Sequence, residues 1–394
     1  MIARKTVLCL AISQLVAWGI SYYLIGVFGG LIAADFGWSS EIVYGGFAAA
    51  LLVMGLTSSV IGRLIDRHGG RPVMIVGALL NALGCLGLAL SSGLISYYAA
   101  WICLGLAMRL TLYDAAFAAL ARIGGQQARR PISQITLLGG LASTVLWPIG
   151  HTLAEQFGWR GAVIAYAGFA LLTIPLYLTI PAGRAKPVDT PQTVTSSPPL
   201  AKGSRDVMIL GGLYAVIASM ANFLNAGMSA HMVGVLTGVG LTAATAVWVA
   251  TLRGVGQSLS RFCEVLFGDR IDPLKLNVLA TLALPIAFAA GLFSGTSLIA
   301  AIVFASLYGA GNGLLTITRG TMPLVLFDPR SYGTLVGRLI APSFILSAVA
   351  PVAYAFVIER FGNSGALYLS QAAAAIALLA GVLLLILCRS RRPA

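Results

Sequence analysis

The chain has 394 residues, of which 58% are hydrophobic and only 9% are charged. Soluble globular domains carry about 25% charged residues, so this composition excludes an ordinary soluble protein and indicates one that is surrounded by lipid. A net charge of +13 would suggest a nucleic-acid partner in a soluble protein, but the basic residues stand in short groups between apolar runs, and we expect no nucleic acid to bind.

Apolar runs long enough to cross a bilayer follow one another along the chain. A spanning helix needs roughly 20 apolar residues, and because lipid offers the backbone no hydrogen-bond partners, each run is expected to be helical. The first run follows Arg4 and Lys5 and is too long for the apolar core of a signal peptide, so we expect it to be retained. The predicted helices lie at about 7–33, 41–62, 72–91, 95–121, 132–155 and 160–181, and then at about 207–234, 242–267, 274–293, 297–326, 332–358 and 364–388.

A polar segment divides these helices into two sets. Residues 182–205 hold four prolines among Ser, Thr and charged residues, a composition typical of a flexible linker. A short repeat supports two related halves, because Phe-Gly-Trp-Arg-Gly-Ala at 157–162 recurs as Phe-Gly-Asn-Ser-Gly-Ala at 361–366, and paired repeats are typical of secondary transporters. The sequence therefore predicts an N-terminal six-helix bundle over 1–181, a cytoplasmic linker over 182–205 and a C-terminal six-helix bundle over 206–394.

The positions of Lys and Arg predict the orientation of the chain. Eighteen of these residues fall on the side that holds the N-terminus, whereas only Arg160 and Arg360 fall on the opposite side. Positive loops face the cytoplasm. We therefore expect a monomeric, multi-pass protein of a bacterial inner membrane, with both termini in the cytoplasm and the lipid bilayer as its surroundings.

One loop motif stands between the second and third predicted helices. Residues 62–73 read Gly-Arg-Leu-Ile-Asp-Arg-His-Gly-Gly-Arg-Pro-Val. Gly62 allows two helices to approach closely, and Asp66 can cap the N-terminus of a facing helix. With Arg67 and Arg71, which anchor the loop, Asp66 is a candidate for a gating role.

This motif resembles the loop signature of the major facilitator superfamily. The resemblance extends over nearly the whole chain and implies an all-α membrane protein, with twelve transmembrane helices in two pseudo-symmetric six-helix bundles. It also implies a secondary transporter that works by alternating access. We expect no enzyme activity and no cofactor, since no metal or nucleophile constellation is visible and the sequence has no Gly-x-x-x-x-Gly-Lys-Ser/Thr loop for ATP.

A narrower likeness concerns the eighth helix, which resembles that of the monocarboxylate and oxalate/formate branch. That branch has an acid four residues before an arginine linked to its substrate. In this chain Gln257 takes the place of the acid, four residues before Arg261. The first helix also lacks the lysine that is often found in monocarboxylate carriers, so the substrate does not follow from the resemblance.

Several ionisable residues lie deep within the predicted helices, where they are costly and therefore candidates for function. The arginines outnumber the acids among them, which favours an anionic solute, and a guanidinium group matches the geometry of a carboxylate. The alternative that some of the arginines extend to the membrane interface stays open. The deep set is Arg109, Asp114, Arg253, Arg261, Glu264, Arg319 and Arg338.

The spacing of these residues places several of them on common helix faces. Arg253, Gln257, Arg261 and Glu264 follow at intervals of 4, 4 and 3 and share one stripe. Aromatic and amide residues could line the solute path, or could instead connect helices; they include Trp18, Asn222, Asn225 and Tyr308. The predicted substrate-binding residues are Arg109, Tyr113, Arg253, Gln257, Arg261, Tyr22 and Asn312.

The sequence thus predicts a permease, symporter or antiporter, for a small anionic organic solute, with protons as the coupling ion. Asp114 and Glu264 are the proton candidates because burial favours the neutral form of a carboxylate. Asp114 and Arg319 are further predicted to form a gate, or, in the alternative, each pairs within its own half, Asp114 with Arg109 or Arg122. The alternatives are an efflux permease for a drug or a toxic metalloid such as an arsenical or antimonial, or a membrane sensor.

Overall fold

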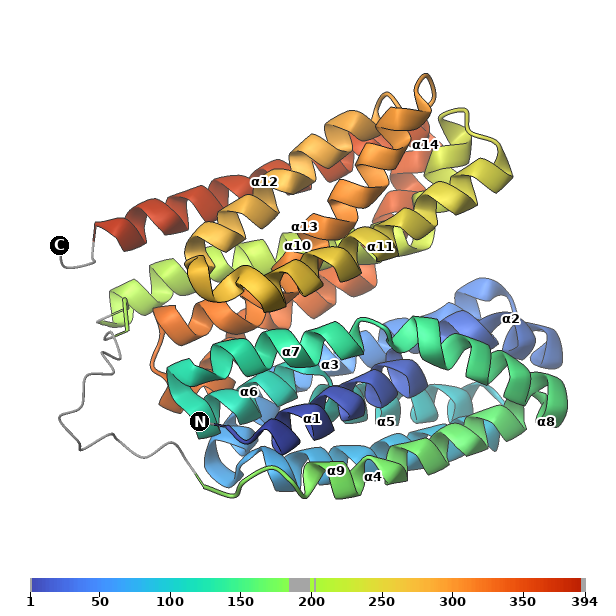
Figure 1. Ribbon diagram of the computed structural model, residues 1–394. Helices are drawn as coiled ribbons and strands as arrows, with labels where there is room; N and C mark the ends of the chain where they lie inside the picture. The colour runs from blue at the N-terminus through green and yellow to red at the C-terminus, as the bar shows by residue number, and fades with distance from the viewer. Residues whose placement is uncertain (1, 184–198, 202, 391–394) are drawn as a thin grey trace. The chain divides into compact units, whose positions relative to one another are not determined.

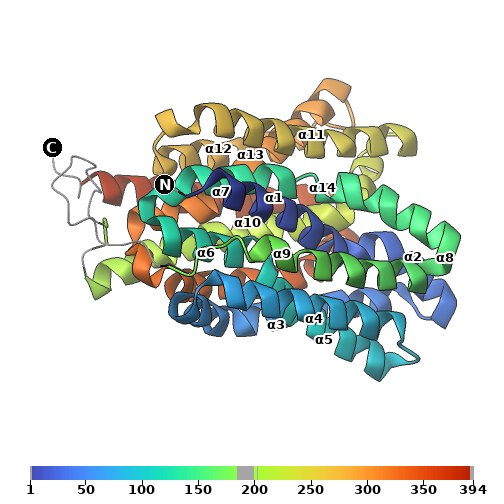
Figure 2. The same ribbon diagram turned by 60° about the horizontal axis from the view of Figure 1, so that its bottom comes forward.

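The computed structural model describes residues 2–183, 199–201 and 203–390, and these residues are helical apart from short connections (Figures 1 and 2). The chain divides into two compact units. The first unit comprises Met1–Ser196 with Asp328–Ala341, and the second comprises Ser197–Phe327 with Pro342–Ala394. Most of the predicted linker over 182–205 lies outside the described residues, so the predicted division into 1–181 and 206–394 stays a prediction.

The first unit contains the helices that run from blue to green in Figure 1. Each predicted run of this half is occupied by one helix or by consecutive helices. The helices are α1 (Arg4–Ala17), the π-helical turn η1 (Trp18–Tyr22), α2 (Leu24–Phe36), α3 (Ser40–His68), α4 (Gly70–Ala89), α5 (Leu94–Thr111), α6 (Tyr113–Gly124), the 3-10 turn η2 (Gly125–Ala128), α7 (Arg129–Gly139), α8 (Ala142–Leu172) and α9 (Ile174–Tyr177).

The second unit is built from long helices that are less often interrupted than those of the first unit. The last helix, α14 (Tyr332–Arg389), follows the turn η4 (Pro329–Ser331). It begins within the first unit and passes into the second unit at Pro342. The other helices are α10 (Ser204–Gly238), α11 (Ala243–Phe267), the 3-10 turn η3 (Gly268–Arg270), α12 (Pro273–Gly291) and α13 (Leu298–Leu326).

The sequence repeat corresponds to a repeated backbone bend. Gly158 within α8 has φ 70° and ψ 167°, and Gly362 within α14 has φ 71° and ψ −178°. Only glycine adopts this conformation readily, because it lacks a Cβ. Each of these two long helices is therefore bent into two arms at the same place in the repeat.

α11 has the reverse of the amphipathic pattern of a soluble helix. Eight helical stretches of the described residues are long and apolar enough to cross a membrane, and α11 is not among them. Its exposed positions carry large apolar side chains such as Trp248, Val255 and Leu259, whereas Arg261 and Glu264 are buried. Apolar residues outside and charged residues inside are what a helix needs when lipid surrounds it.

Glycines let the helices of the second unit meet closely at α11. A Cβ added at Gly309 of α13 would overlap the carbonyl oxygen of Arg253, and one at Gly313 would lie 2.6 Å from that of Gln257. Small residues at such contacts allow backbones to touch. The polar stripe of α11 is thereby brought directly against α13.

Candidate functional site

Arg253 is the centre of a polar cluster within the second unit. Its Nη2 atom donates hydrogen bonds to Asn225 Oδ1 at 2.6 Å and to Ser229 Oγ at 3.0 Å, both on α10. Its guanidinium carbon lies 5.2 Å from the centre of the Tyr308 ring on α13. Two hydrogen bonds and a cation–π contact therefore hold the half-buried guanidinium in one place.

Asn225 of α10 also bonds to α13, the helix that carries Tyr308. Its Oδ1 atom also accepts a hydrogen bond from Asn312 Nδ2 at 2.9 Å, and the hydroxyl of Tyr308 donates to the carbonyl of Leu224 at 3.0 Å. Within the described part of the chain, Arg253 forms no ion pair, and its hydrogen-bond partners are all neutral. Its positive charge is therefore oriented but not compensated.

Arg261 lies two turns further along the same face of α11. It is buried, and its Nη2 atom donates to Thr316 Oγ1 at 3.2 Å, while this hydroxyl donates to the carbonyl of Asn312 at 3.0 Å. Glu264 is 7% exposed on this face. The half-buried side chain of Gln257 forms no hydrogen bond among the described residues, so the structure does not join it to the cluster.

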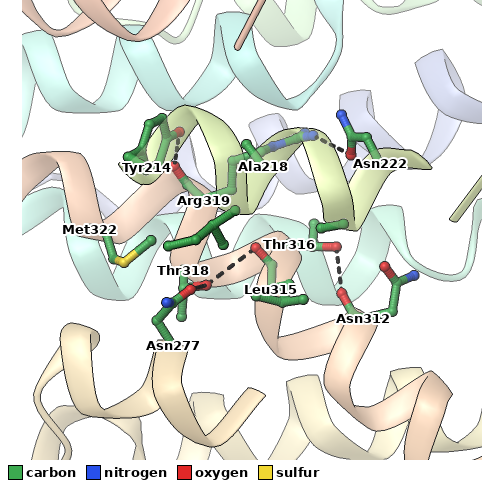
Figure 3. Close-up of a pocket in the computed structure, with 12 residues that line it drawn as sticks. Tyr214, Ala218, Asn222, Asn277, Asn312, Leu315, Thr316, Thr318, Arg319 and Met322 are labelled. Carbon is green, nitrogen blue, oxygen red and sulfur yellow. Dashed lines mark hydrogen bonds between the residues drawn. The ribbon is translucent and has the colours of Figure 1, made fainter. Parts of the chain in front are cut away.

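Arg319 belongs to a neighbouring part of the second unit (Figure 3). Its Nη1 atom donates to Asn222 Oδ1 at 3.3 Å, and Asn222 Nδ2 donates to Ser343 Oγ at 2.9 Å. The hydroxyl of Tyr214 donates to the carbonyl of Arg319 at 2.8 Å. Arg253 and Arg319 are thus tied to two asparagines of α10 that lie three residues apart, Asn225 and Asn222.

The first unit offers aromatic rings. Tyr22 lies in the π-helical turn η1, with its ring centre 4.9 Å from that of Trp18 and 5.1 Å from that of Phe47. Trp18 is also 4.8 Å from Tyr113, whose hydroxyl donates to the carbonyl of Thr136 at 3.1 Å. π-helical turns are rare and frequent at functional sites. This aromatic cluster is a face on which an apolar group could pack.

Arg109 is held by a serine of α3. It is buried on α5, where Nε donates to Ser58 Oγ at 3.1 Å and Nη2 donates to the carbonyl of Ser58 at 3.2 Å. The helix is interrupted at Leu112, which has ψ −176°, and Tyr113 begins α6. The helical spacing from Arg109 to Tyr113 therefore does not place them on one face, because the helix between them is not continuous.

The motif residue Asp66, near the C-terminal end of α3 and not in a loop, contacts the N-terminus of α14. Its Oδ1 atom accepts from the Gly333 amide at 3.0 Å, and Oδ2 accepts from both the amide and the hydroxyl of Thr334 at 2.6 Å. A carboxylate is favourable at a helix N-terminus, where the amides are unpaired and the dipole is positive. Arg122 donates to the carbonyl of Asp66. Arg67 is exposed and Arg71 half-buried, and the gating role of the three motif residues stays a prediction.

The two predicted partners of the gate belong to different units. Asp114, in the first turn of α6, is 8% exposed and lies in the first unit. Arg319 lies in the second unit. The predicted pairing of Asp114 with Arg319 stays a prediction.

Comparison with known proteins identifies the family. The family model described as the Major Facilitator Superfamily matches residues 10–232, which is more than half of the chain. The chain belongs to this superfamily. It is therefore a multi-pass membrane protein and a secondary transporter, not an enzyme.

Individual members of the superfamily are similar to this chain in sequence or in fold. Monocarboxylate transporter 3 of Mus musculus is 32% identical over 142 residues, which cover 35% of this chain and 27% of that protein. The chain thus matches only about a quarter of the length of this relative. Two solved structures show the fold: the proton:xylose symporter XylE (TM-score 0.73, 12% identity, 95% of this chain and 94% of that one) and the human organic anion transporter MFSD10 (TM-score 0.71, 16% identity, 97% and 99%).

Several polar residues that the structure brings to the interior of this superfamily member were not predicted from the sequence. Gln14 is buried and donates from Nε2 to the carbonyl of Thr111 at 2.7 Å, next to the interruption at Leu112. Asn81 and Asn277 are likewise buried, and Ser229 holds Arg253. The sequence signal that could have identified them is a polar residue inside an apolar run, since such residues face the protein interior and not the lipid.

Proposed function

We propose that this transporter moves a small organic anion, such as a monocarboxylate, and that protons drive it. The observation that supports this proposal is the state of Arg253. A positive charge inside a membrane protein is costly unless a counter-charge or a ligand accompanies it. Arg253 is held by neutral side chains only, so an anionic solute would supply the missing charge.

The hydrogen bonds of Arg253 also fit ligand binding. Nη2 is used by Asn225 and Ser229, whereas Nε and Nη1 form no hydrogen bond among the described residues. The N–H groups of these two atoms can donate to a carboxylate. Because the guanidinium is already oriented, little side-chain entropy is lost when the anion binds.

The relatives point in the same direction. A matched relative is named a monocarboxylate transporter, and two similar folds are a proton:xylose symporter and an organic anion transporter. For the proton, Asp114 and Glu264 are the buried carboxylates of α6 and α11 among the predicted site residues. A carboxylate can take up and release a proton, so these two residues are the candidates for proton exchange during transport.

The test compares uptake by Arg253 variants in proteoliposomes. With radiolabelled lactate and an inward proton gradient, we expect the wild type to accumulate the label, and Arg253→Gln to reduce kcat/KM at least tenfold because the charge is gone. Arg253→Lys keeps the charge but loses the planar fork, so its KM is expected to rise with less effect on kcat. The matched control is Arg63→Gln, at an exposed position of α3, which should transport normally.

The proposal fails if Arg253→Gln transports lactate and a panel of other monocarboxylates as the wild type does. It also fails if the neutral amide of a substrate is transported as well as its carboxylate. Uptake that is unaffected by a protonophore would remove the proton from the proposal and leave the anion.

A further inference from the structure

The second unit contains a pocket between α10, α12 and α13 that the proposed solute contact at Arg253 does not use. Figure 3 shows Asn222, Asn277, Thr318 and Arg319 around it. Its empty space, together with the part that is open to solvent, is about 340 Å³. Most of this space is open to solvent, so the enclosed part suits only a group of a few atoms.

The first unit fills the corresponding place with a side chain. Buried positions of α1 and α10 match at the offset of the sequence repeat, 204 residues, since Leu10 and Tyr214, and Ala17 and Ala221, are all buried. At the same offset Ala218, which lines the pocket, corresponds to Gln14.

A buried asparagine also bonds to a threonine beside this position in each unit, although these two pairs do not match at the offset of 204 residues. In the first unit Asn81 Nδ2 donates to Thr111 Oγ1 at 3.2 Å, and the Gln14 carboxamide donates to the Thr111 carbonyl. In the second unit Thr318 Oγ1 donates to Asn277 Oδ1 at 3.3 Å, and Ala218 has only a methyl group where the first unit has the longer side chain of Gln14. The pocket therefore lies beside a position that carries a much smaller side chain than its counterpart in the first unit.

Two of the groups that line the pocket are hydrogen-bond donors, the Asn277 amide and the Arg319 guanidinium. Asn277 is 1% exposed, and its Nδ2 forms no hydrogen bond among the described residues. Arg319 adds a positive charge, and no acidic side chain is among the residues that line the pocket. A buried amide without a partner is costly, so an acceptor that enters the pocket would be stabilised.

We propose that this pocket binds a small anion, either a carboxylate or a halide, through Asn277 and Arg319. The pocket adjoins the solute contact at Arg253, because Asn312 lines the pocket and donates to Asn225, but Arg319 and Arg253 bond to different asparagines of α10. The anion has two possible sources, the carboxylate of an organic acid and an inorganic halide of the medium. The proposal does not depend on which solute is transported.

The experiment measures thermal unfolding of the purified full-length protein in detergent. The buffer contains gluconate, which is too large for the pocket, and sodium acetate or sodium chloride is titrated as the probe. We expect a saturable rise in Tm for the wild type with at least one probe, because a ligand that binds only the folded state stabilises it. The probe that saturates at the lower concentration identifies the source.

Ala218→Gln is the decisive variant, since it gives the second unit the side chain that the first unit has. It is expected to raise the half-saturating anion concentration at least tenfold while its Tm without anion stays equal to or above that of the wild type. The matched control is Gln14→Ala in the first unit. This variant should have a lower Tm without anion but should keep the anion-dependent rise.

Asn277→Asp provides a second variant if Ala218→Gln does not fold. It changes the size of the side chain little but places a carboxylate in the pocket, so it should abolish the response. A wild type that responds to neither probe, or pocket variants that respond as the wild type does, would overturn the proposal. Arg253→Gln should keep the anion-dependent rise in Tm whether or not it still transports lactate. The proposed solute contact at Arg253 and the proposed anion pocket can therefore fail separately.

Discussion

The two units repeat their glycine contacts but differ in the polar side chains around them. A Cβ at Gly105 of α5 would lie 2.5 Å from the carbonyl oxygen of Ala50 on α3, and one at Gly309, 204 residues later, would overlap that of Arg253 on α11. Gly158 and Gly362 share a backbone bend at the same offset. These pairs show that backbone geometry has been kept where two helices touch or bend.

The side chains that follow Gly158 and Gly362 differ between the two units. In the first unit Arg160 pairs with Asp35 at 2.9 Å and packs over the ring of Trp159, whereas the second unit has Ser364 and Asn363 in the corresponding positions. The difference indicates that packing restricts the backbone of both halves. The polar side chains were free to diverge toward an aromatic face in one unit and an arginine–amide cluster in the other.

The largest expected effect tests the repeated helix contact. Gly105→Ala and Gly309→Ala should each lower the free energy of unfolding by about 3 kcal/mol, because a methyl group would be forced against a backbone carbonyl that cannot move away. Thermal unfolding in detergent measures the loss. The controls are Gly168→Ala and Gly212→Ala, helical positions with nothing within 4 Å, which should be neutral or slightly stabilising. If only one of the two contact variants is destabilised, the contact is not equivalent in the two units.

An intermediate effect is expected at the repeated bend. Gly158→Ala and Gly362→Ala should each cost about 2 kcal/mol, since alanine is strained at φ near +70°. Nothing lies within 4 Å of a Cβ at either glycine, so the cost is conformational and should be alike in both units. Unequal shifts of Tm for the two variants would contradict this comparison.

The smallest effect concerns the side chains that diverged. Arg160→Ala removes a half-exposed ion pair and hydrogen bonds to the carbonyls of Ala89 and Ser91, and we expect a loss of about 1 kcal/mol. Ser364→Ala, at the corresponding place, should be neutral. High salt should reduce the difference between wild type and Arg160→Ala, because it screens the ion pair. A large effect at Ser364 would mean that this end of the second unit is fastened by other contacts.

The fold was predictable because its signals are local. Each apolar run is long, and the repeated glycine at 158 and 362 marks both bends in the sequence itself. The stripe of α11 was also predictable, because a continuous helix fixes which residues share a face. Arg261 and Glu264 are indeed buried on it.

Other parts of the candidate site depend on contacts between distant residues. The helix is interrupted at Leu112 although neither Gly nor Pro is present there. Gln14, 97 residues from Thr111 in the sequence, donates a hydrogen bond to the Thr111 carbonyl beside this interruption. Ser58 as the partner of Arg109, and Ser229 as a partner of Arg253, likewise follow from helix packing. No spacing rule within one helix contains this information.

The inverted polarity of α11 has a consequence for the biogenesis of the protein. An arginine at the centre of a helix costs about 2.5–3.5 kcal/mol when a segment enters the membrane alone. Of the helices that hold Arg253, α10 is synthesised before α11, but α13, with Tyr308, is synthesised after it. α11 is therefore expected to leave the translocon for the bilayer together with its neighbours and not as a single segment.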